Sequence, residues 1–300
     1  MSFNLNPVTM EQSNVTALFL PLALGIIMLG MGMTLTIADF KRVFIYPKAV
    51  MLGLGNQLLL LPFIGFLLAV GFDLKPELAV GMMLLALCPG GATSNIISHL
   101  AKADLALSIS LTAISSIITN FTIPIFLNLA LFHFMGGDEA VQLPIGKAIL
   151  QIFVVTILPV SIGMMIKQRL PRFTEKSLKA VNIVSAVFFV LILLMAILKE
   201  RTNIVPYFVQ AGVPALVLNV LALLLGYVTG LAFALNFKQR VAISIETGIQ
   251  NGTLAIGIAL SPAMLNNTEM AIPAAIYSLM MFVTATLVVL WSRSRAELDI

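Results

Sequence analysis

The sequence predicts an all-α integral membrane protein with nine transmembrane helices, and three observations support this prediction. Of the 300 residues, 60% are hydrophobic and only 10% are charged. The mean hydropathy is +1.06, whereas a soluble domain carries about 25% charged residues. Long apolar runs follow one another, and no connection between them is long enough for a soluble domain. We therefore expect residues 1–300 to form a single membrane domain.

Nine segments are long enough to cross a bilayer, which requires about 20 mostly apolar residues in a helix. They are residues 15–37, 46–70, 77–100, 105–133, 145–166, 178–198, 205–235, 241–260 and 271–291. An odd number of spans puts the two termini on opposite sides of the membrane. Because most of the 17 basic residues fall on the side of the C-terminus, we expect that side to be cytoplasmic and the N-terminus to lie outside.

The basic balance of the chain does not indicate a nucleic-acid partner. The pI is about 9.3, but the Lys and Arg residues are scattered between apolar runs instead of forming a basic patch. The partners expected from composition are the lipid bilayer and a small solute. The single cysteine, Cys88, has no second cysteine with which to form an internal disulfide.

The nine segments divide into an inverted repeat. Residues 15–133 form the first repeat, 145–166 a connecting span, and 178–291 the second repeat, which runs in the opposite direction. The third segment of each repeat is interrupted by polar and Gly-rich sequence, Leu-Cys-Pro-Gly-Gly-Ala-Thr-Ser-Asn at 87–95 and Glu-Thr-Gly-Ile-Gln-Asn-Gly-Thr at 246–253. Matching interrupted segments in two inverted halves are typical of the binding site of a transporter. Glycine alone would fit close helix packing equally well, but the accompanying polar residues favour binding.

Glu246 is the one acidic residue inside a predicted span, and no Lys or Arg lies in a span to pair with it. An unpaired carboxylate at the bilayer centre costs at least about 2.5 kcal/mol, so Glu246 is expected either to be protonated or to bind a cation. The surrounding residues favour an alkali cation, which prefers oxygen ligands. Side chains with neutral oxygens are Gln57, Ser94, Asn95, Ser108, Thr112, Thr247 and Gln250.

These segments resemble the bile acid/sodium symporter family, including bacterial homologues of the sodium-dependent bile acid transporters. The resemblance covers nearly the whole chain, including the stretch from residues 25–28 through 39–40, and is most specific at residues 88–95 and 246–251. It implies the nine-helix form of a fold with a core domain and a panel domain. In that fold the third and eighth spans are discontinuous and cross each other. The resemblance also implies a multi-pass protein of the bacterial cytoplasmic (inner) membrane that functions as a monomer.

The resemblance further implies two Na⁺ ions bound at the helix crossing as co-transported ligands. The first sodium site would use Ser94, Asn95, Ser108, Thr112 and Glu246. The second would use the side chains of Gln57, Glu246 and Gln250 with the backbone carbonyls of Thr247 and Ile249. Each of the side-chain positions carries a suitable oxygen in this sequence.

The expected substrate is an organic anion, either bile acid-like or a small carboxylate such as pantoate or a keto acid. Some bile-acid-binding members have a polar His-Asn pair in the last span, but residues 278–282 are apolar here apart from Ser278. Thr93, Asn251 and Ser278 are the expected substrate contacts. Together these features predict sodium-coupled symport by alternating access.

Other functions remain open at this point. A proton-coupled carrier would use Glu246 as its proton site, and an uncoupled carrier of an organic anion could have the same fold. A channel is disfavoured because nothing indicates a ring of pore-lining charges. An enzyme is not expected, because Glu246 has no second buried acid or central histidine with which to perform acid–base chemistry.

Overall fold

The computed structural model describes residues 7–136, 143–199 and 204–298, and these residues are helical with no regular β-strand. Six helices in this part of the chain are long and apolar enough to cross a membrane. They are Pro47–Gly71, Leu105–Met135, Ile145–Arg169, Pro171–Met195, Val205–Ala232 and Glu269–Arg295. Two further apolar helices, Phe19–Gly32 and Pro76–Leu87, are shorter. The prediction of an all-α integral membrane protein is therefore confirmed.

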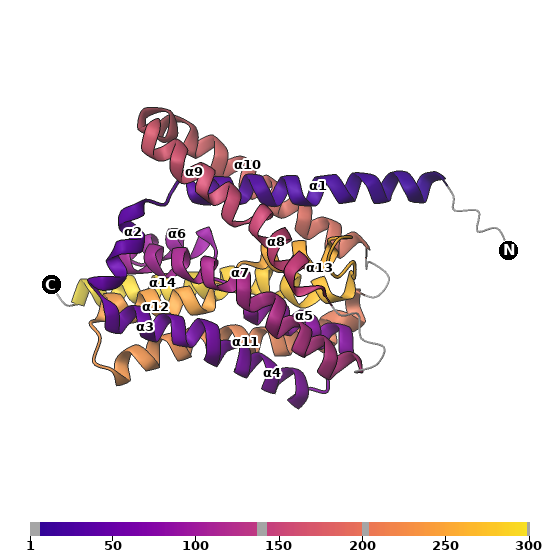
Figure 1. The fold of residues 1–300 in the computed structure, drawn as a ribbon. Helices are drawn as coiled ribbons and strands as arrows, with labels where there is room; N and C mark the ends of the chain where they lie inside the picture. Colours follow the sequence, from indigo (N-terminus) through magenta and orange to yellow (C-terminus); the bar gives the residue numbers. More distant parts are fainter. Residues whose placement is uncertain (1–6, 137–142, 200–203, 299–300) are drawn as a thin grey trace.

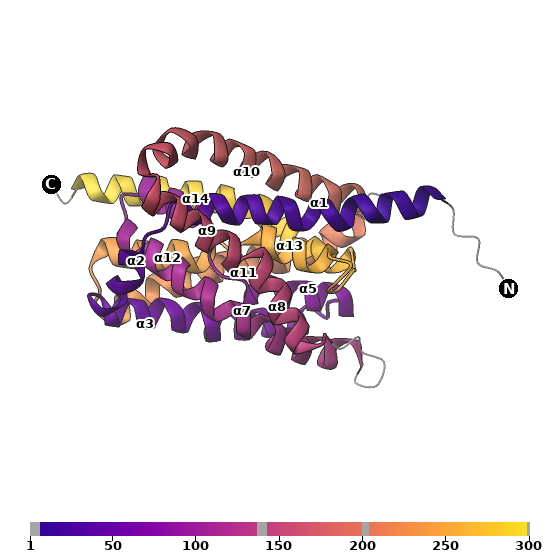
Figure 2. The ribbon, with the colours of Figure 1, turned by 45° about the horizontal axis from the view of Figure 1, so that its top comes forward.

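The helices form two layers (Figure 1). The smaller layer contains α1 (Pro7–Gly32), α9 (Ile157–Arg169) and α10 (Pro171–Lys199), and α8 (Ile145–Val155) leads from it toward the larger layer. Figure 2 shows α1 and α10 side by side, in agreement with their extensive contact. The larger layer contains α3 (Pro47–Gly55), α4 (Leu61–Gly71), α5 (Pro76–Leu87), α6 (Ala92–Leu100), α7 (Leu105–Met135), α11 (Ile204–Ala232), α12 (Phe237–Gly248), α13 (Gly252–Leu260) and α14 (Ile272–Leu298).

The expected span at 145–166 consists of two helices, because α8 and α9 meet at an irregular residue, Thr156. The Thr156 hydroxyl donates to the carbonyl oxygen of Ile152 at 2.6 Å. Side-chain bonds of this kind to the preceding turn often bend membrane helices. The bend lets α8 contact α7 while α9 packs along α1.

Two glycines allow α1 and α9 to touch through their backbones. A Cβ atom on Gly163 would overlap the backbone at Leu29 and Gly32 of α1 and at Met33, which follows it. A Cβ on Gly32 would overlap Val160 of α9. Small residues permit such close approach where lipid provides no hydrophobic drive between helices.

Gly163→Ala is expected to lower the free energy of unfolding of the detergent-solubilised protein by about 1–3 kcal/mol, because the backbones must separate to admit the methyl group. Thermal unfolding measures the loss. Gly71→Ala is the matched control, since nothing lies within 4 Å of a Cβ at Gly71. Equal stability of the two variants would contradict the close contact.

Two helices of the larger layer are interrupted in the middle of the molecule, as the sequence predicts. The helical halves α5 and α6 are separated by residues 88–91, and α12 and α13 by residues 249–251. The two pairs run in opposite directions, so α6 lies against α12 and α5 lies against α13 (Figure 1). The interruptions are shorter than the polar motifs, which leaves Ser94 and Asn95 in the first turn of α6 and Glu246 in the last turn of α12.

The two interruptions satisfy much of each other's backbone hydrogen bonding. Gly90 and Gln250 form an isolated antiparallel bridge. Asn251 N donates to the Pro89 carbonyl at 2.9 Å, and Gly91 N donates to the Ile249 carbonyl at 3.4 Å. Unwound backbone at membrane depth requires such partners, since lipid offers none. The crossing is thus held together by main-chain bonds between residues about 160 positions apart.

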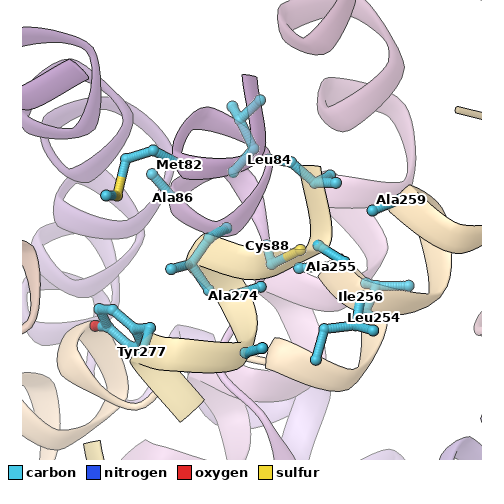
Figure 3. Packing of buried hydrophobic residues seen from close by; sticks show 14 of the residues in the cluster. Met82, Leu84, Ala86, Cys88, Leu254, Ala255, Ile256, Ala259, Ala274 and Tyr277 are labelled. Carbon is cyan, nitrogen blue, oxygen red and sulfur yellow. The ribbon is translucent and has the colours of Figure 1, made fainter. Parts of the chain in front are cut away.

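Apolar side chains surround the crossing. Every residue of α5 from Leu78 to Leu87 is buried, which is the pattern of a helix enclosed on all sides. Figure 3 shows Cys88 packed among side chains of α13 and α14, including Ala255 and Ala274. This core excludes lipid from the polar residues at the crossing.

Candidate ion and substrate site at the helix crossing

The Glu246 carboxylate lies at the centre of the crossing, with only 2% of the residue exposed. Three hydroxyl groups donate to it. Thr112 Oγ1 is 2.6 Å from Oε1, while Ser94 Oγ and Ser108 Oγ are 2.8 Å and 3.2 Å from Oε2. Within the described residues the one ion pair joins Arg42 to Asp39, so Glu246 has no basic partner there. The carboxylate is surrounded by neutral oxygen atoms.

Asn95 completes this group. Its side-chain oxygen accepts from Ser108 at 3.0 Å and from Thr112 at 3.3 Å, and its amide nitrogen is buried without a partner. Ser108 and Thr112 lie four residues apart on one face of α7, as predicted. The structure therefore brings together all five residues expected at the first sodium site, from α6, α7 and α12.

A second polar group joins the two interruptions through a pair of glutamines. Gln57 Nε2 donates to the Cys88 carbonyl at 2.6 Å and to Gln250 Oε1 at 3.0 Å. Gln250 Nε2 in turn donates to the Thr247 carbonyl at 2.6 Å. Gln57 lies in η2 (Asn56–Leu60), a π-helical turn between α3 and α4, and such turns often occur at functional sites.

The residues expected at the second sodium site are thus only partly gathered around one point. Gln57, Gln250 and the Thr247 carbonyl are hydrogen-bonded to one another. The Ile249 carbonyl accepts from Gly91 instead, and the carboxylate of Glu246 is bonded within the first group. Glu246 and Gln250 are four residues apart in the chain, on either side of the point where α12 ends.

A cavity of about 260 Å³ lies beside the crossing, between the two layers. Thr93 and Asn251, two of the expected substrate contacts, line it. Ser278 does not line this cavity. It is fully buried, and its hydroxyl lies against Gly252, where a Cβ would overlap it.

The sequence reasoning missed the contribution of the opposite layer to this cavity. Asn182, Ser185 and Phe189 of α10 line its other wall. Asn182 and Ser185 are polar residues in a predicted span, and that pattern could have identified them. Among the residues that the structure describes, the cavity is lined by apolar and neutral polar side chains and by no charged one.

The described part of the chain contains no group of three or more His, Cys, Asp or Glu side chains that could hold a metal ion. The donors at the crossing are hydroxyl, amide and carbonyl oxygens with a single carboxylate. This donor set suits a hard alkali cation better than zinc or a transition metal.

A helical membrane protein whose two interrupted helices cross at a buried carboxylate has the architecture of a secondary transporter. The sequence model of the Sodium Bile acid symporter family matches residues 21–206. The chain belongs to this family, and it is accordingly a transmembrane transporter and not an enzyme.

Curated relatives agree with this assignment. The chain is 31% identical to the uncharacterized sodium-dependent transporter YocS of Bacillus subtilis, over 87% of this chain and 78% of that protein. It is 30% identical to the probable sodium/metabolite cotransporter BASS2, chloroplastic, of rice, over 91% of this chain but only 63% of the relative. It is 28% identical to the human ileal sodium/bile acid cotransporter, over 85% and 73% of the two chains.

Proposed function

We propose that this protein is a sodium-coupled symporter of a small organic anion, with two Na⁺ ions bound at the helix crossing. The observation that carries the proposal is the Glu246 carboxylate, buried among neutral oxygens where the two interrupted helices meet. A buried carboxylate without a basic partner needs a cation or a proton. The names of the relatives, which include sodium-dependent and sodium/metabolite transporters, favour sodium.

The first ion would lie among Ser94, Asn95, Ser108, Thr112 and Glu246. Hydroxyl groups can rotate, so the three that donate to Glu246 can also turn their lone pairs toward a cation. Asn95 already directs its oxygen toward Ser108 and Thr112.

The second ion would lie between Glu246 and the glutamine pair. Gln57 and Gln250 contribute side-chain oxygens, and Thr247 and Ile249 contribute carbonyls. Those carbonyls now accept bonds from Gln250 and Gly91, so the ion would replace bonds that already hold the crossing together.

The substrate would be a small monoanion held in the cavity lined by Thr93 and Asn251. Two Na⁺ ions and one carboxylate leave a net charge of about +1, which a monoanion neutralises. The cavity is about 260 Å³, below the range of roughly 300–1,000 Å³ for drug-sized ligands. This volume favours a carboxylate the size of pantoate or a keto acid over a bile acid. Ser278 would act through Gly252, which lines the cavity.

The N-terminal ends of α6 and α13 add to the attraction for an anion. Ala92 and Thr93 begin α6, Gly252 and Thr253 begin α13, and all four line the cavity. The start of a helix carries a partial positive charge of about +0.5. An anion there would need no Lys or Arg.

The proposed topology is nine spans in an inverted repeat, with the two interrupted pairs each counting as one span. The smaller layer would be the panel domain and the larger layer the core domain, which rock against each other to expose the cavity alternately. In both views the start of α1 and the end of α14 lie at opposite ends of the molecule, as an odd number of spans requires. We propose that the N-terminus is outside, the C-terminus is cytoplasmic, and the protein works as a monomer in the bacterial inner membrane.

Uptake into proteoliposomes tests the function. We expect an inward Na⁺ gradient to drive accumulation of at least one of radiolabelled pantoate, pyruvate or taurocholate, and the smaller anions to be preferred. Replacing external Na⁺ with choline at fixed pH should stop uptake. Undiminished uptake in choline would contradict sodium coupling and favour the proton-coupled or uncoupled carrier.

A further inference from the structure

The carbonyl oxygen of Gly248 is held by two buried side chains that the sites described above do not use. Asn219 Nδ2 of α11 and the Tyr277 hydroxyl of α14 each donate to it at 2.8 Å. Asn219 and Tyr277 are both fully buried, with 0% exposed. Gly248 is the last residue of α12, so its carbonyl is at the edge of the second interruption.

This carbonyl has lost its helical partner. In a continuous helix it would accept from the N–H of Gly252, but Gly252 N donates to the Gln250 carbonyl instead. An unpaired backbone carbonyl at membrane depth costs several kcal/mol. Asn219 and Tyr277 replace the missing donor, and they do so from two different helices.

The other end of the Asn219 amide also has a hydrogen-bond partner. Thr284 Oγ1 donates to Asn219 Oδ1 at 2.5 Å. The Gly248 carbonyl can only accept, so it takes the amide nitrogen of Asn219, and the amide oxygen is left to accept from Thr284. The interruption also lies close against α11, since a Cβ on Gly248 would overlap Leu223. Hence the short Asn219 side chain can reach the carbonyl.

The first interruption has a corresponding bond. Gln57 Nε2 donates at 2.6 Å to the carbonyl of Cys88, the C-cap residue directly after α5. The two amide donors precede their acceptors by similar intervals, 31 residues for Gln57 and 29 for Asn219. Each donor lies in the second expected span of its repeat. Each acceptor carbonyl lies at the point where the first half of the interrupted helix ends.

The two amides differ in what their other end does. The oxygen of Gln57 accepts from Gln250 Nε2 at 3.3 Å. The oxygen of Asn219 instead accepts from Thr284, and the carbonyl that Asn219 bonds is shared with Tyr277. The first half of the chain thus uses this position at the proposed ion site. In the second half, the amide at the corresponding position, Asn219, holds the backbone of the interruption and is not a proposed ligand.

We propose that Asn219, Tyr277 and Thr284 form a positioning triad, which sets the sodium affinity of the crossing by holding the Gly248 carbonyl without touching the ion. This inference rests on the proposed function. Gly248 lies between Glu246 and Gln250, both proposed ligands, and its peptide is flanked by the carbonyls of Thr247 and Ile249. Fixing one peptide of this segment therefore restricts all four groups, and ligands held in place before binding lose less entropy when the ion arrives.

The test is a Na⁺ titration of the purified full chain, followed as the increase in unfolding temperature and run with K⁺ replacing Na⁺ at constant ionic strength. Because this increase grows with the logarithm of the Na⁺ concentration, the half-saturating Na⁺ concentration is obtained by fitting that dependence. Na⁺ alone is the probe. We expect Asn219→Ala and Tyr277→Phe each to raise the half-saturating Na⁺ concentration about tenfold, the equivalent of one lost hydrogen bond. Thr284→Val should raise it in the wild-type background but add nothing to Asn219→Ala, because Thr284 acts through Asn219.

Asn128→Ala is the matched control. Asn128 also bonds backbone with both ends of its amide, donating to the Leu143 carbonyl and accepting from Leu143 N, each at 2.8 Å. Its loss should lower the unfolding temperature and leave the half-saturating Na⁺ concentration unchanged.

The outcomes separate the inference from the function on which it rests. If the wild type gains no stability in Na⁺ over K⁺, the proposed function fails. If the wild type responds but Tyr277→Phe and Asn219→Ala keep its half-saturating concentration, as Asn128→Ala does, the triad is merely structural and the inference is overturned. Tyr277→Phe removes a single oxygen, so it provides this answer even if Asn219→Ala does not fold.

Discussion

Glu246→Gln is expected to reduce Na⁺-driven uptake at least about 100-fold and to abolish the stabilisation of the purified protein by Na⁺. Glutamine keeps the shape of the side chain and can still bond Ser94 and Thr112. It removes the one negative charge that both proposed ions share. Leaving a buried charge without its partner costs about 3–5 kcal/mol, which exceeds the 2.7 kcal/mol that a 100-fold loss represents.

The same substitution should not destabilise the protein when sodium is replaced by K⁺. Glu246 is buried, and no basic side chain pairs with it in the described residues, so a neutral amide is easier to bury than the carboxylate. Glu175→Gln, the same change at an exposed position of α10, is the control and should leave both measurements unchanged. If Glu246→Gln retains uptake that depends on sodium, the carboxylate is not the shared ligand.

The sequence predicts the chemistry of the crossing because that chemistry depends on residue type and membrane depth. A carboxylate inside an apolar chain demands a partner wherever the neighbouring helices lie. The same holds for Gln57, and the structure bonds it to Cys88 and Gln250. Asn219 is an equally isolated amide in an apolar run, so the sequence also indicates that it needs a hydrogen-bond partner.

Features that depend on distant neighbours could not be derived in this way. The helices resume at Ala92 and Gly252, so each interruption is shorter than the polar motif that contains it. Gly90 and Gln250 pair across the crossing at these short interruptions. The bridge joins residues 160 positions apart, and no local propensity encodes it. Ser278 is an expected substrate contact, and its hydroxyl occupies the space that a Cβ atom on residue 252 would fill if that residue were not glycine. That direction follows from how α13 and α14 pack.

Gly90→Ala is expected to disable the crossing while changing no proposed ligand. A Cβ on Gly90 would overlap Glu246 Oε1, lie 2.7 Å from the carboxyl carbon, and approach the Glu246 main-chain oxygen to 3.3 Å. Real Cβ atoms essentially never show contacts under 3.0 Å, so the carboxylate must move away from Ser94 and Thr112, or the Gly90–Gln250 bridge must open. Overpacking of this kind typically costs about 1–3 kcal/mol.

We therefore expect the half-saturating Na⁺ concentration of Gly90→Ala to rise about 10- to 100-fold, which corresponds to roughly 1.4–2.8 kcal/mol. Titration of the unfolding temperature against Na⁺ measures it. Gly146→Ala adds the same methyl group in α8, where nothing lies within 4 Å of the new atom, and should bind sodium like the wild type. The methyl group carries no charge and removes no ligand. A loss of sodium affinity in Gly90→Ala but not in Gly146→Ala would therefore show that this affinity depends on where the two interruptions hold the carboxylate. Wild-type affinity in Gly90→Ala would mean that the ions bind elsewhere.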